Sequence, residues 1–242
     1  MELEGRKALV TGAGATGGIG FEIARRFIAA GAVVLITGRD PSRGAEAAEA
    51  LGDRASFLLA DLVELEALDR LLDAAGEVDI LVNNATATGR GNVVDGNISG
   101  LDEVHFTNVR APYVLTAGLV PGMVSRQSGC VVNISSLVAG RGTPGMGSYA
   151  ASKAALESLT QTWAAELGGS GVRVNAVAPG PIRSAKNLTE HQDELEEFGK
   201  VTPLRRTGAT AEIAEVVAFL ASDRSSYVTG TVIPVDGGSR AI

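Results

Sequence analysis

Tyr149 and Lys153 are four residues apart in a segment of helical periodicity, and Ser136 lies upstream among apolar and small residues. Residues i and i+4 of a helix share one face, so the Lys153 ammonium is expected near the Tyr149 phenol. A cation ~5 Å away at an effective dielectric of ~20 favours the phenolate by roughly 3 kcal/mol, or about 2 pKa units. Burial opposes this shift, so a second positive charge, such as an oxidised nicotinamide ring, would help complete it. The trio predicts acid–base chemistry.

The Tyr-x-x-x-Lys spacing alone is a weak signal, because an ordinary pair on a helix surface has the same pattern. Its meaning comes from the motifs that accompany it along the chain. A glycine-rich turn near the start, NNA at residues 83–85, the serine, the Tyr–Lys pair and a PG turn follow one another in order.

Composition restricts the classes of protein. With 242 residues and 45% hydrophobic content, we expect one domain, residues 1–242, around one substantial core. A net charge of −7 without a Lys/Arg run argues against nucleic acid and anionic membrane surfaces as partners. Small molecules and copies of the same chain are the expected partners.

The lone cysteine, Cys130, opens an apolar stretch, so we interpret it as a buried structural thiol rather than a nucleophile. No metal site is predicted. The charged amino terminus has too short an apolar run for a signal peptide, and no segment reaches the ~20 apolar residues of a membrane helix. A cytoplasmic location is the expectation.

Short β-branched runs alternate with stretches of helical period. The predicted strands are Ala8–Val10, Val33–Thr37, Ser56–Leu59, Ile80–Val82, Val131–Ile134, Val172–Val177 and Val232–Val235, and the predicted helices are Ile19–Ala30, Arg43–Leu51, Leu65–Ala75, Leu101–Val120, Tyr149–Leu167 and Ala211–Ala221. Strands that are apolar throughout indicate a sheet covered on both faces. We therefore predict an α/β fold: a single Rossmann-type, doubly wound domain with a seven-stranded, mostly parallel sheet and helices on both faces.

The stretch from about residue 184 to 207 interrupts this rhythm, and an insertion after a strand's carboxyl end commonly forms a substrate lid. Its acidic cluster (Asp193, Glu194, Glu196 and Glu197) is interpreted as a solvated helix face. The role of His191 beside it stays open.

The first predicted strand runs into TGAGATGGIG, residues 11–20, and then into a helix. Glycines there let backbone N–H groups at the helix start face a pyrophosphate. This context predicts a dinucleotide site, with Gly12, Gly14, Thr16, Gly18, Ile19 and Gly20 as candidate contacts.

The end of the second strand reads TGR, and the adenosine ribose of a dinucleotide would lie there. Arg39 favours a 2′-phosphate and hence NADP(H), although Asp40 follows it, and NAD(H) remains the alternative. Arg39 as a plain surface charge is also open. Asp61 and Leu62 follow the next strand at a distance suited to the adenine ring.

Together these motifs resemble the short-chain dehydrogenase/reductase family. The likeness rests on the glycine cluster after TG, NNA, Asn108, NISS ending at Ser136, YAASK at residues 149–153, NAVAPGPI at residues 175–182 and TGTVIPVDGG near the carboxyl end. The resemblance spans nearly the whole chain.

This resemblance implies a role for each matching residue. Tyr149 would be the general acid or base, Lys153 its tuner and a ribose ligand, Ser136 the polariser of the substrate carbonyl, and Asn108 the holder of a water in a proton relay. Ser135 would be a structural hydroxyl. The cofactor-binding set would also include Asn83, Ala85, Tyr149, Lys153, Pro179, Gly180, Ile182 and Ser184.

Asn108 also has support from the residues themselves. Pro112 lacks the N–H that would bond the carbonyl of residue 108 in a helix, so that carbonyl needs another partner, and a bound water is our hypothesis. The alternative is a helix kink without a chemical role.

Two departures from the family pattern matter. The glycine turn is two residues longer than usual, so either Gly12 or Gly14 could be its first glycine, and Thr86 replaces the glycine that usually follows NNA.

The resemblance implies an oxidoreductase that transfers a hydride between a nicotinamide and a ketone or secondary alcohol, and Arg39 favours NADPH-dependent reduction. Gln127 and Ser170 stand where relatives acting on carrier-bound substrates tend to have basic residues, with only Arg126 nearby, so a free ketone is favoured. The alternatives are an NAD-dependent alcohol dehydrogenase and a non-catalytic dinucleotide-binding regulator. A homo-oligomer, tetramer or dimer, is expected from the resemblance alone.

Overall fold

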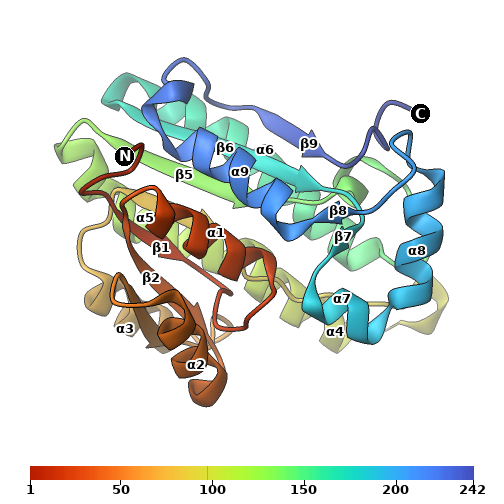
Figure 1. Cartoon of the computed structure of the whole chain (residues 1–242). Helices are drawn as coiled ribbons and strands as arrows, with labels where there is room; N and C mark the ends of the chain where they lie inside the picture. The colour runs from red at the N-terminus through yellow and green to blue at the C-terminus, as the bar shows by residue number, and fades with distance from the viewer. Residues whose placement is uncertain (97) are drawn as a thin grey trace.

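A parallel sheet forms the centre of the computed structural model, which describes residues 1–96 and 98–242 (Figure 1). Its order is β3-β2-β1-β4-β5-β6-β9, and every pairing is parallel. The strands are β1 Lys7–Val10, β2 Val33–Gly38, β3 Ala55–Leu59, β4 Ile80–Asn83, β5 Gly129–Ile134, β6 Val172–Pro179 and β9 Val232–Val235. The predicted fold class and the seven predicted strands are confirmed.

Helices cover both faces of this sheet. They are α1 Ile19–Ala29, α2 Pro41–Leu51, α3 Leu65–Ala75, α4 Ile98–His105, α5 Ala111–Ser125, α6 Gly147–Leu167 and α9 Thr210–Ala221, with α7 Ala185–Glu190 and α8 Gln192–Val201 between β6 and α9. Strand side chains alternate between two hydrophobic cores. Ala8 and Val10 lie in the core under α1, α2 and α9, whereas Leu9 lies in the core under α3, α5 and α6.

The chain reverses its direction of strand addition next to β1. From β1 it adds β2 and β3 on one side, and from β4 it adds β5 and β6 on the other. Loops diverge at the carboxyl ends of β1 and β4, and this switch point is where open α/β sheets bind ligands. The fold therefore predicts a binding crevice at this edge of the sheet.

The predicted helix Leu101–Val120 is helical throughout, but it is not one uniform α-helix. The structure has α4, then a π-helical turn at Phe106–Arg110, then α5. The Ala111 N–H donates to the Phe106 carbonyl, five residues back, immediately before Pro112. Proline has no N–H to donate to the carbonyl four residues before it, so the regular α-helical hydrogen bonding is interrupted here and a π turn forms instead.

The two short strands β7 and β8 were not predicted. β7 Ile182–Arg183 pairs in parallel with β8 Gly208–Ala209 and closes the base of the segment that holds α7 and α8. Two residues give no periodic signal, so this pairing has no signature in the sequence. Among the described residues, no helix combines the length and apolar character that crossing a bilayer would require.

Candidate active site

The three residues of the predicted acid–base trio come together at the carboxyl edge of the sheet. Ser136 follows β5 and caps a 3₁₀ turn, Leu137–Gly140, by accepting a hydrogen bond from the Val138 N–H at 3.4 Å. Tyr149 and Lys153 lie in the first two turns of α6, with the Lys153 Nζ 5.7 Å from the centre of the Tyr149 ring. The Ser136 and Thr86 side chains hydrogen-bond the phenol.

The pKa of Tyr149 moves opposite to the sequence-based prediction. Burial raises the pKa of the phenol above its ordinary value, and the hydrogen bonds from Ser136 and Thr86 offset this only in part. The predicted shift towards neutrality is therefore wrong for the protein without ligands, because desolvation outweighs the neighbouring groups. The phenol keeps its proton at neutral pH.

Lys153 is a buried amine with one protein partner for its ammonium hydrogens. Its side chain is 1% exposed, and its Nζ donates to the Ile134 carbonyl at 2.8 Å. Burial lowers the pKa of Lys153 from 10.5 to about 7. An ammonium carries three hydrogens, so Lys153 retains donors for hydroxyl groups of a bound ligand.

Asn108 has its side-chain amide committed to protein groups. Its Oδ1 accepts from the Ala87 N–H at 2.8 Å, and its Nδ2 donates to the Ala87 carbonyl at 2.9 Å and to the Ser152 hydroxyl at 3.0 Å. Ser152 in turn donates to the Tyr149 carbonyl at 2.7 Å. Asn108 therefore connects the loop after β4 to the helix that carries Tyr149. The bound water at the main-chain carbonyl of Asn108 stays a prediction.

The glycine turn is held by the NNA segment. The Thr11 hydroxyl accepts the N–H groups of Asn84 and Ala85, both at 3.0 Å, and the Asn84 amide donates to the carbonyls of Thr11 and Gly12. Gly12 has φ +66°, and a Cβ there would lie 2.6 Å from the Ala85 Cα. A side chain at this position would clash with Ala85, so the turn requires glycine here, while both Gly12 and Gly14 stay candidates for the first glycine of the phosphate-binding pattern.

The amino end of α1 is free to bind an anion. Gly18 is its N-cap and supplies no side-chain cap, so the first-turn N–H groups of this 11-residue helix have no side-chain acceptor. Gly20 lies against the Asn84 amide and the Gly12 carbonyl, where a Cβ would clash. Together with the spare donors of Lys153, this cradle fits a dinucleotide.

The Asn83 side chain points into the sheet rather than into the crevice. Its Nδ2 donates to the Asn133 Oδ1 on β5 at 2.8 Å, and the Asn133 Nδ2 donates to the Thr160 hydroxyl on α6 at 2.8 Å. Asn83 is 2% exposed and Asn133 is fully buried. The predicted contact between Asn83 and the cofactor therefore stays a prediction. It would have to be made by the main chain of Asn83.

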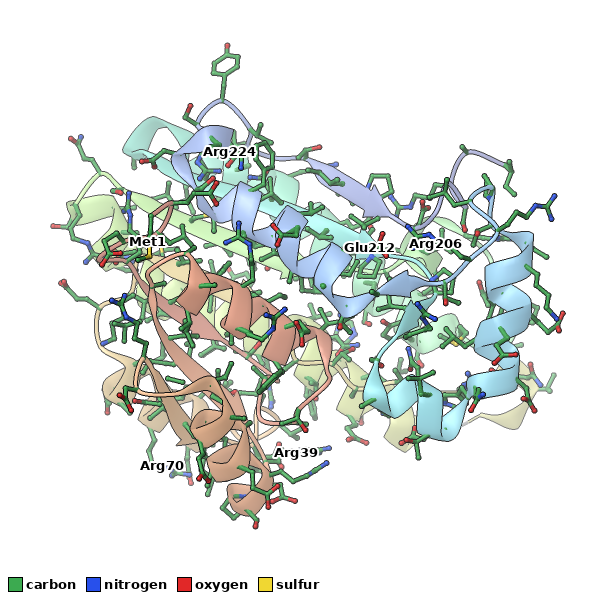
Figure 2. All side chains as sticks on the ribbon, in the orientation of Figure 1. Met1, Arg39, Arg70, Arg206, Glu212 and Arg224 are labelled. Carbon is green, nitrogen blue, oxygen red and sulfur yellow. The ribbon has the colours of Figure 1, made fainter. Side chains whose placement is uncertain are left out.

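Arg39 extends from the end of β2 to the surface, near the lower edge of Figure 2. Its Nη1 lies 3.7 Å from the Glu103 Oε1 on α4, and both side chains are more than half exposed. Asp40 instead caps α2, accepting the N–H groups of Ser42 and Arg43 at 3.0 Å each. Arg39 therefore remains largely exposed beside one carboxylate, whereas the Asp40 carboxylate already accepts two main-chain N–H groups.

The remaining predicted cofactor contacts line the same edge. Leu62 is buried, and the Asp61 carboxylate accepts the Val63 N–H at 3.1 Å. In the PG turn, the Gly180 N–H donates to the Val235 carbonyl at 3.0 Å. Ile182 begins β7 directly after this turn, and Pro179 ends β6. Thr16 is exposed beside Gly18.

The segment predicted as a lid is attached at two points. The Ala185 N–H at the start of α7 donates to the Gly17 carbonyl at 3.0 Å, next to Ser184, which caps α7 through the Asn187 N–H. Glu194 on α8 pairs with Arg90 of the loop after β4 at 3.1 Å. All four acidic residues of the cluster are exposed on α8, as expected of a solvated helix face.

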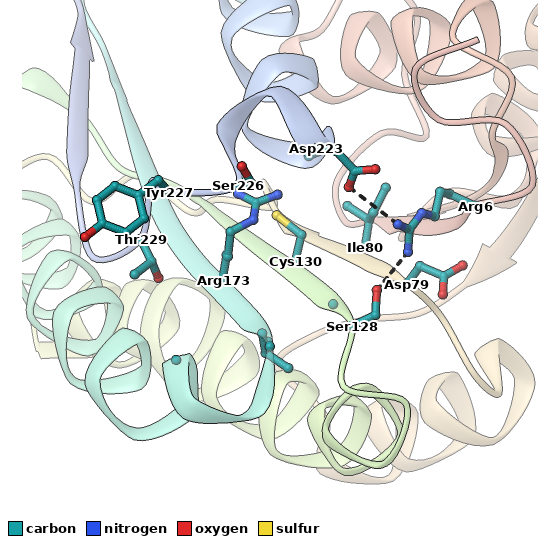
Figure 3. Close-up of a pocket in the computed structure, with 15 residues that line it drawn as sticks. Arg6, Asp79, Ile80, Ser128, Cys130, Arg173, Asp223, Ser226, Tyr227 and Thr229 are labelled. Carbon is teal, nitrogen blue, oxygen red and sulfur yellow. Dashed lines mark hydrogen bonds and ion pairs between the residues drawn. The ribbon is translucent and has the colours of Figure 1, made fainter.

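A cavity of about 580 Å³ lies at the opposite, amino-terminal edge of the sheet (Figure 3). Its arginines already have protein partners: Arg6 contacts Ser128 and Asp223, and Arg173 donates to the Ser222 carbonyl and the Ser225 hydroxyl. The Cys130 thiol beside them donates to the Leu220 carbonyl, and burial raises its pKa to about 11, in line with the predicted structural thiol. This cavity is remote from Tyr149. Within the described residues no cluster of three His, Cys, Asp or Glu side chains could hold a metal.

Comparison with known proteins identifies the family. The family model described as "Enoyl-(Acyl carrier protein) reductase" matches residues 12–240. A solved short chain dehydrogenase/reductase family protein is 50% identical, with a TM-score of 0.95 and 100% of both chains covered. This chain belongs to the short-chain dehydrogenase/reductase family. As a member, it is an NAD(P)-dependent oxidoreductase that acts on CH–OH and C=O groups.

Among relatives of this short-chain dehydrogenase/reductase, Nodulation protein G of Rhizobium sp. (strain N33) is 41% identical, covering 98% of each chain. The 3-oxoacyl-(acyl-carrier-protein) reductase FabG of Thermotoga maritima is 38% identical, covering 98% of this chain and 99% of its own. A crystal structure assigned as an NAD(P)-dependent gluconate 5-dehydrogenase from Beutenbergia cavernae, with NADP bound at low occupancy, is 36% identical, with a TM-score of 0.93 and coverage of 100% and 99%.

Sequence reasoning missed several positioning residues. Ser152 lies inside YAASK, and Thr11 and Asn84 lie next to candidate site residues. Their polar side chains at these positions could have indicated a positioning role. Glu157 and Arg240, which contact Ser135 and Ser136, had no such signal because they lie far from the serines in the sequence.

Proposed function

We propose that this protein is an NADP(H)-dependent ketone reductase, with Tyr149 as general acid and Ser136 as the carbonyl-polarising hydroxyl. The observation that carries the proposal is the convergence of the Tyr149 phenol, the Ser136 hydroxyl and the Lys153 amine at the carboxyl edge of the sheet. A hydroxyl pair and an adjacent amine suit proton delivery to a carbonyl oxygen.

A reduced nicotinamide supplies the hydride when it is bound. Tyr149 is protonated at neutral pH because burial raises its pKa, so it is ready to donate a proton to the oxygen as an alkoxide forms. Ser136 donates a second hydrogen bond to the same oxygen and stabilises its developing charge. Lys153, held by the Ile134 carbonyl, offers its other hydrogens to ribose hydroxyls.

Several elements of the chain would hold the cofactor. The Gly12–Gly20 turn and the free amino end of α1 would take the pyrophosphate. Asp61 and Leu62 would border the adenine, and Ile182 and Ser184 would meet the nicotinamide carboxamide. Helices α7 and α8 would close over the substrate as a lid.

The preference for NADP(H) over NAD(H) rests on the end of β2. Arg39 is exposed and its nearest carboxylate, Glu103, is 3.7 Å away, while Asp40 is occupied as a helix cap. An unoccupied carboxylate would favour the two ribose hydroxyls of NAD, whereas a guanidinium favours a 2′-phosphate. The NADP in the Beutenbergia cavernae structure supports the same assignment.

For the substrate we favour a free ketone. The positions expected to dock a carrier protein hold Gln127 and Ser170, and Arg126 nearby already pairs with Glu77 at 2.9 Å. A carrier-bound 3-oxoacyl group is the second candidate, because the Thermotoga maritima relative carries that activity in its name. The cytoplasmic location and the homo-oligomeric state, tetramer or dimer, remain proposals carried by the family resemblance.

The test measures NADPH oxidation with ethyl acetoacetate, cyclohexanone and acetoacetyl groups on an acyl carrier protein. We expect turnover with a free ketone and its loss in Tyr149→Phe. Faster turnover with the carrier-bound group would select the second candidate. Tight NADPH binding without turnover on any ketone would support the dinucleotide-binding regulator and overturn the proposal.

A further inference from the structure

The turn after β9 is held rigidly next to the active site. The Asp236 carboxylate accepts the N–H groups of Gly238 at 2.9 Å and Arg240 at 2.8 Å, and Gly237 and Gly238 have φ of +65° and +88°. A Cβ on Gly180 of the PG turn would lie 2.6 Å from the Asp236 Cα, so the two turns pack backbone to backbone. The main chain of Arg240 is therefore fixed relative to the crevice.

From this turn the Arg240 side chain reaches the back of the catalytic-serine loop. Its Nη2 donates to the Glu157 Oε1 on α6 at 2.8 Å and to the main-chain carbonyl of Ser136 at 3.3 Å. The same Glu157 oxygen accepts the Ser135 hydroxyl at 2.7 Å. One ion pair thus holds both serines, Ser135 through its side chain and Ser136 through its backbone.

This ion pair is partly buried. The side chains of Arg240 and Glu157 are 27% and 18% exposed, whereas both side chains of the Arg39–Glu103 and Arg90–Glu194 pairs are more than half exposed. A partly buried pair is less screened by salt and keeps a defined geometry, while an exposed pair contributes little. The Arg240–Glu157 pair is therefore suited to fixing a backbone position.

We infer that Arg240 is a positioning residue for the catalytic serine: through Glu157 and the Ser136 carbonyl it sets where the Ser136 hydroxyl lies relative to the Tyr149 phenol. The inference rests on the proposed role of Ser136. Without Arg240, the Ser136 carbonyl loses this donor and the Ser136–Gly140 loop gains freedom. A displacement of about 1 Å in a polarising group is expected to slow the chemical step by roughly tenfold or more.

The experiment compares Arg240→Gln and Arg240→Lys with Arg224→Gln. Arg224, labelled in Figure 2, is a matched control because it pairs with Glu2 at 2.9 Å, close to the 2.8 Å of the Arg240–Glu157 pair. Each variant is measured for kcat and KM with NADPH and the ketone that turns over, for NADPH affinity, and for the kinetic isotope effect with deuterium at the transferred position. Hydrogen exchange is followed at the amides of residues 136–141.

We expect Arg240→Gln to lower kcat about tenfold, to leave NADPH affinity unchanged, to raise the isotope effect, and to speed exchange at residues 136–141. Arg240→Lys should recover part of kcat, because an ammonium can still donate to Glu157. Arg224→Gln should match the wild type in all four measurements. A lower kcat with an unchanged isotope effect and unchanged exchange would indicate a merely structural role and overturn the inference.

Hydrogen exchange also separates this inference from the proposed function. If the wild type turns over ketones and Ser136→Ala slows it, but Arg240→Gln leaves exchange and kcat unchanged, only the positioning role is wrong. If no ketone turns over, the proposed function fails, and exchange at residues 136–141 still decides whether Arg240 holds the loop.

Discussion

The Lys153 amine and the Ile134 carbonyl form a hydrogen bond of 2.8 Å inside the protein, so the end of β5 anchors the amine that stands beside Tyr149. Burial holds the pKa of Lys153 at about 7, well below its ordinary 10.5. Lys153 is expected to alter the pKa of the Tyr149 phenol, and the fold lowers the pKa of Lys153 itself by burying it. The stability of the protein should therefore depend on pH through Lys153.

Replacing Lys153 with Met should abolish activity and stabilise the ligand-free protein. In the folded state Lys153 loses its proton near pH 7, whereas in the unfolded chain the lysine stays protonated up to about pH 10.5. The cost of burying the charge is complete below pH 7 and is relieved as pH rises towards 10.5, because the unfolded state then binds more protons. Thermal unfolding should show the largest gain for Lys153→Met near pH ~6 and a smaller one near pH ~9.

A stability gain for Lys153→Met that is the same at both pH values would contradict the lowered pKa. Lys200→Met serves as the control, since Lys200 is exposed and pairs with Glu197 on α8. Its unfolding temperature should change little at either pH.

Tyr149 should give the two reaction directions opposite responses to pH. Because burial raises its pKa, the phenol stays protonated through the neutral range, where of the Tyr149–Lys153 pair only Lys153 titrates, so loss of the phenol's proton should lower the kcat/KM for reduction only at alkaline pH. Oxidation needs the phenolate, so its kcat/KM should rise as pH increases. Tyr149→Phe should lower both by roughly 10²–10⁴-fold. Initial rates across the pH range test this, and a kcat/KM for oxidation that falls as pH increases would rule it out.

Arg39 and Glu103 should have opposite effects on cofactor choice. Arg39→Ala is expected to weaken NADPH binding and to leave NADH binding unchanged, because only the 2′-phosphate needs the guanidinium. Glu103→Gln frees Arg39 from its carboxylate neighbour and should tighten NADPH binding a few-fold. Fluorescence titrations measure both, with Arg70→Ala on α3 as an exposed control (Figure 2). Equal weakening of both cofactors in Arg39→Ala would refute the NADP(H) assignment.

Gly12 should be irreplaceable for steric reasons that Gly52 lacks. Both have positive φ, +66° and +84°, but a Cβ on Gly52 would meet no atom within 4 Å, while one on Gly12 would meet Ala85. Gly52→Ala should therefore cost about 1 kcal/mol of stability through backbone strain. Gly12→Ala should cost more and also eliminate NADPH binding. Denaturant unfolding and cofactor titration compare them, and similar behaviour of the two variants would refute the close packing against Ala85.

The parts of the fold that depend on local pattern were predictable. Buried parallel strands consist of consecutive apolar residues, which identified β4 and β5, and the i, i+4 spacing correctly placed Tyr149 and Lys153 together. The defect before Pro112 was expected at Asn108, but its form, a π turn rather than a simple kink, depends on how the surrounding helices pack.

Other features depend on tertiary structure alone. The direction of the Tyr149 pKa shift was wrong because the extent of burial is set by loops distant in the sequence, including the one that carries Thr86. The contact of Arg240 with Glu157 joins residues 83 positions apart, and no local pattern announces it. The Asn83–Asn133 pair likewise requires the register of β4 against β5.

The hydrogen bond from the Ala185 N–H to the Gly17 carbonyl joins the start of α7, in the proposed lid, to the glycine turn, the proposed pyrophosphate site. A dinucleotide bound at the glycine turn is therefore expected to influence the position of α7. For a reaction with two reactants, this architecture favours a compulsory order in which the dinucleotide arrives first and departs last.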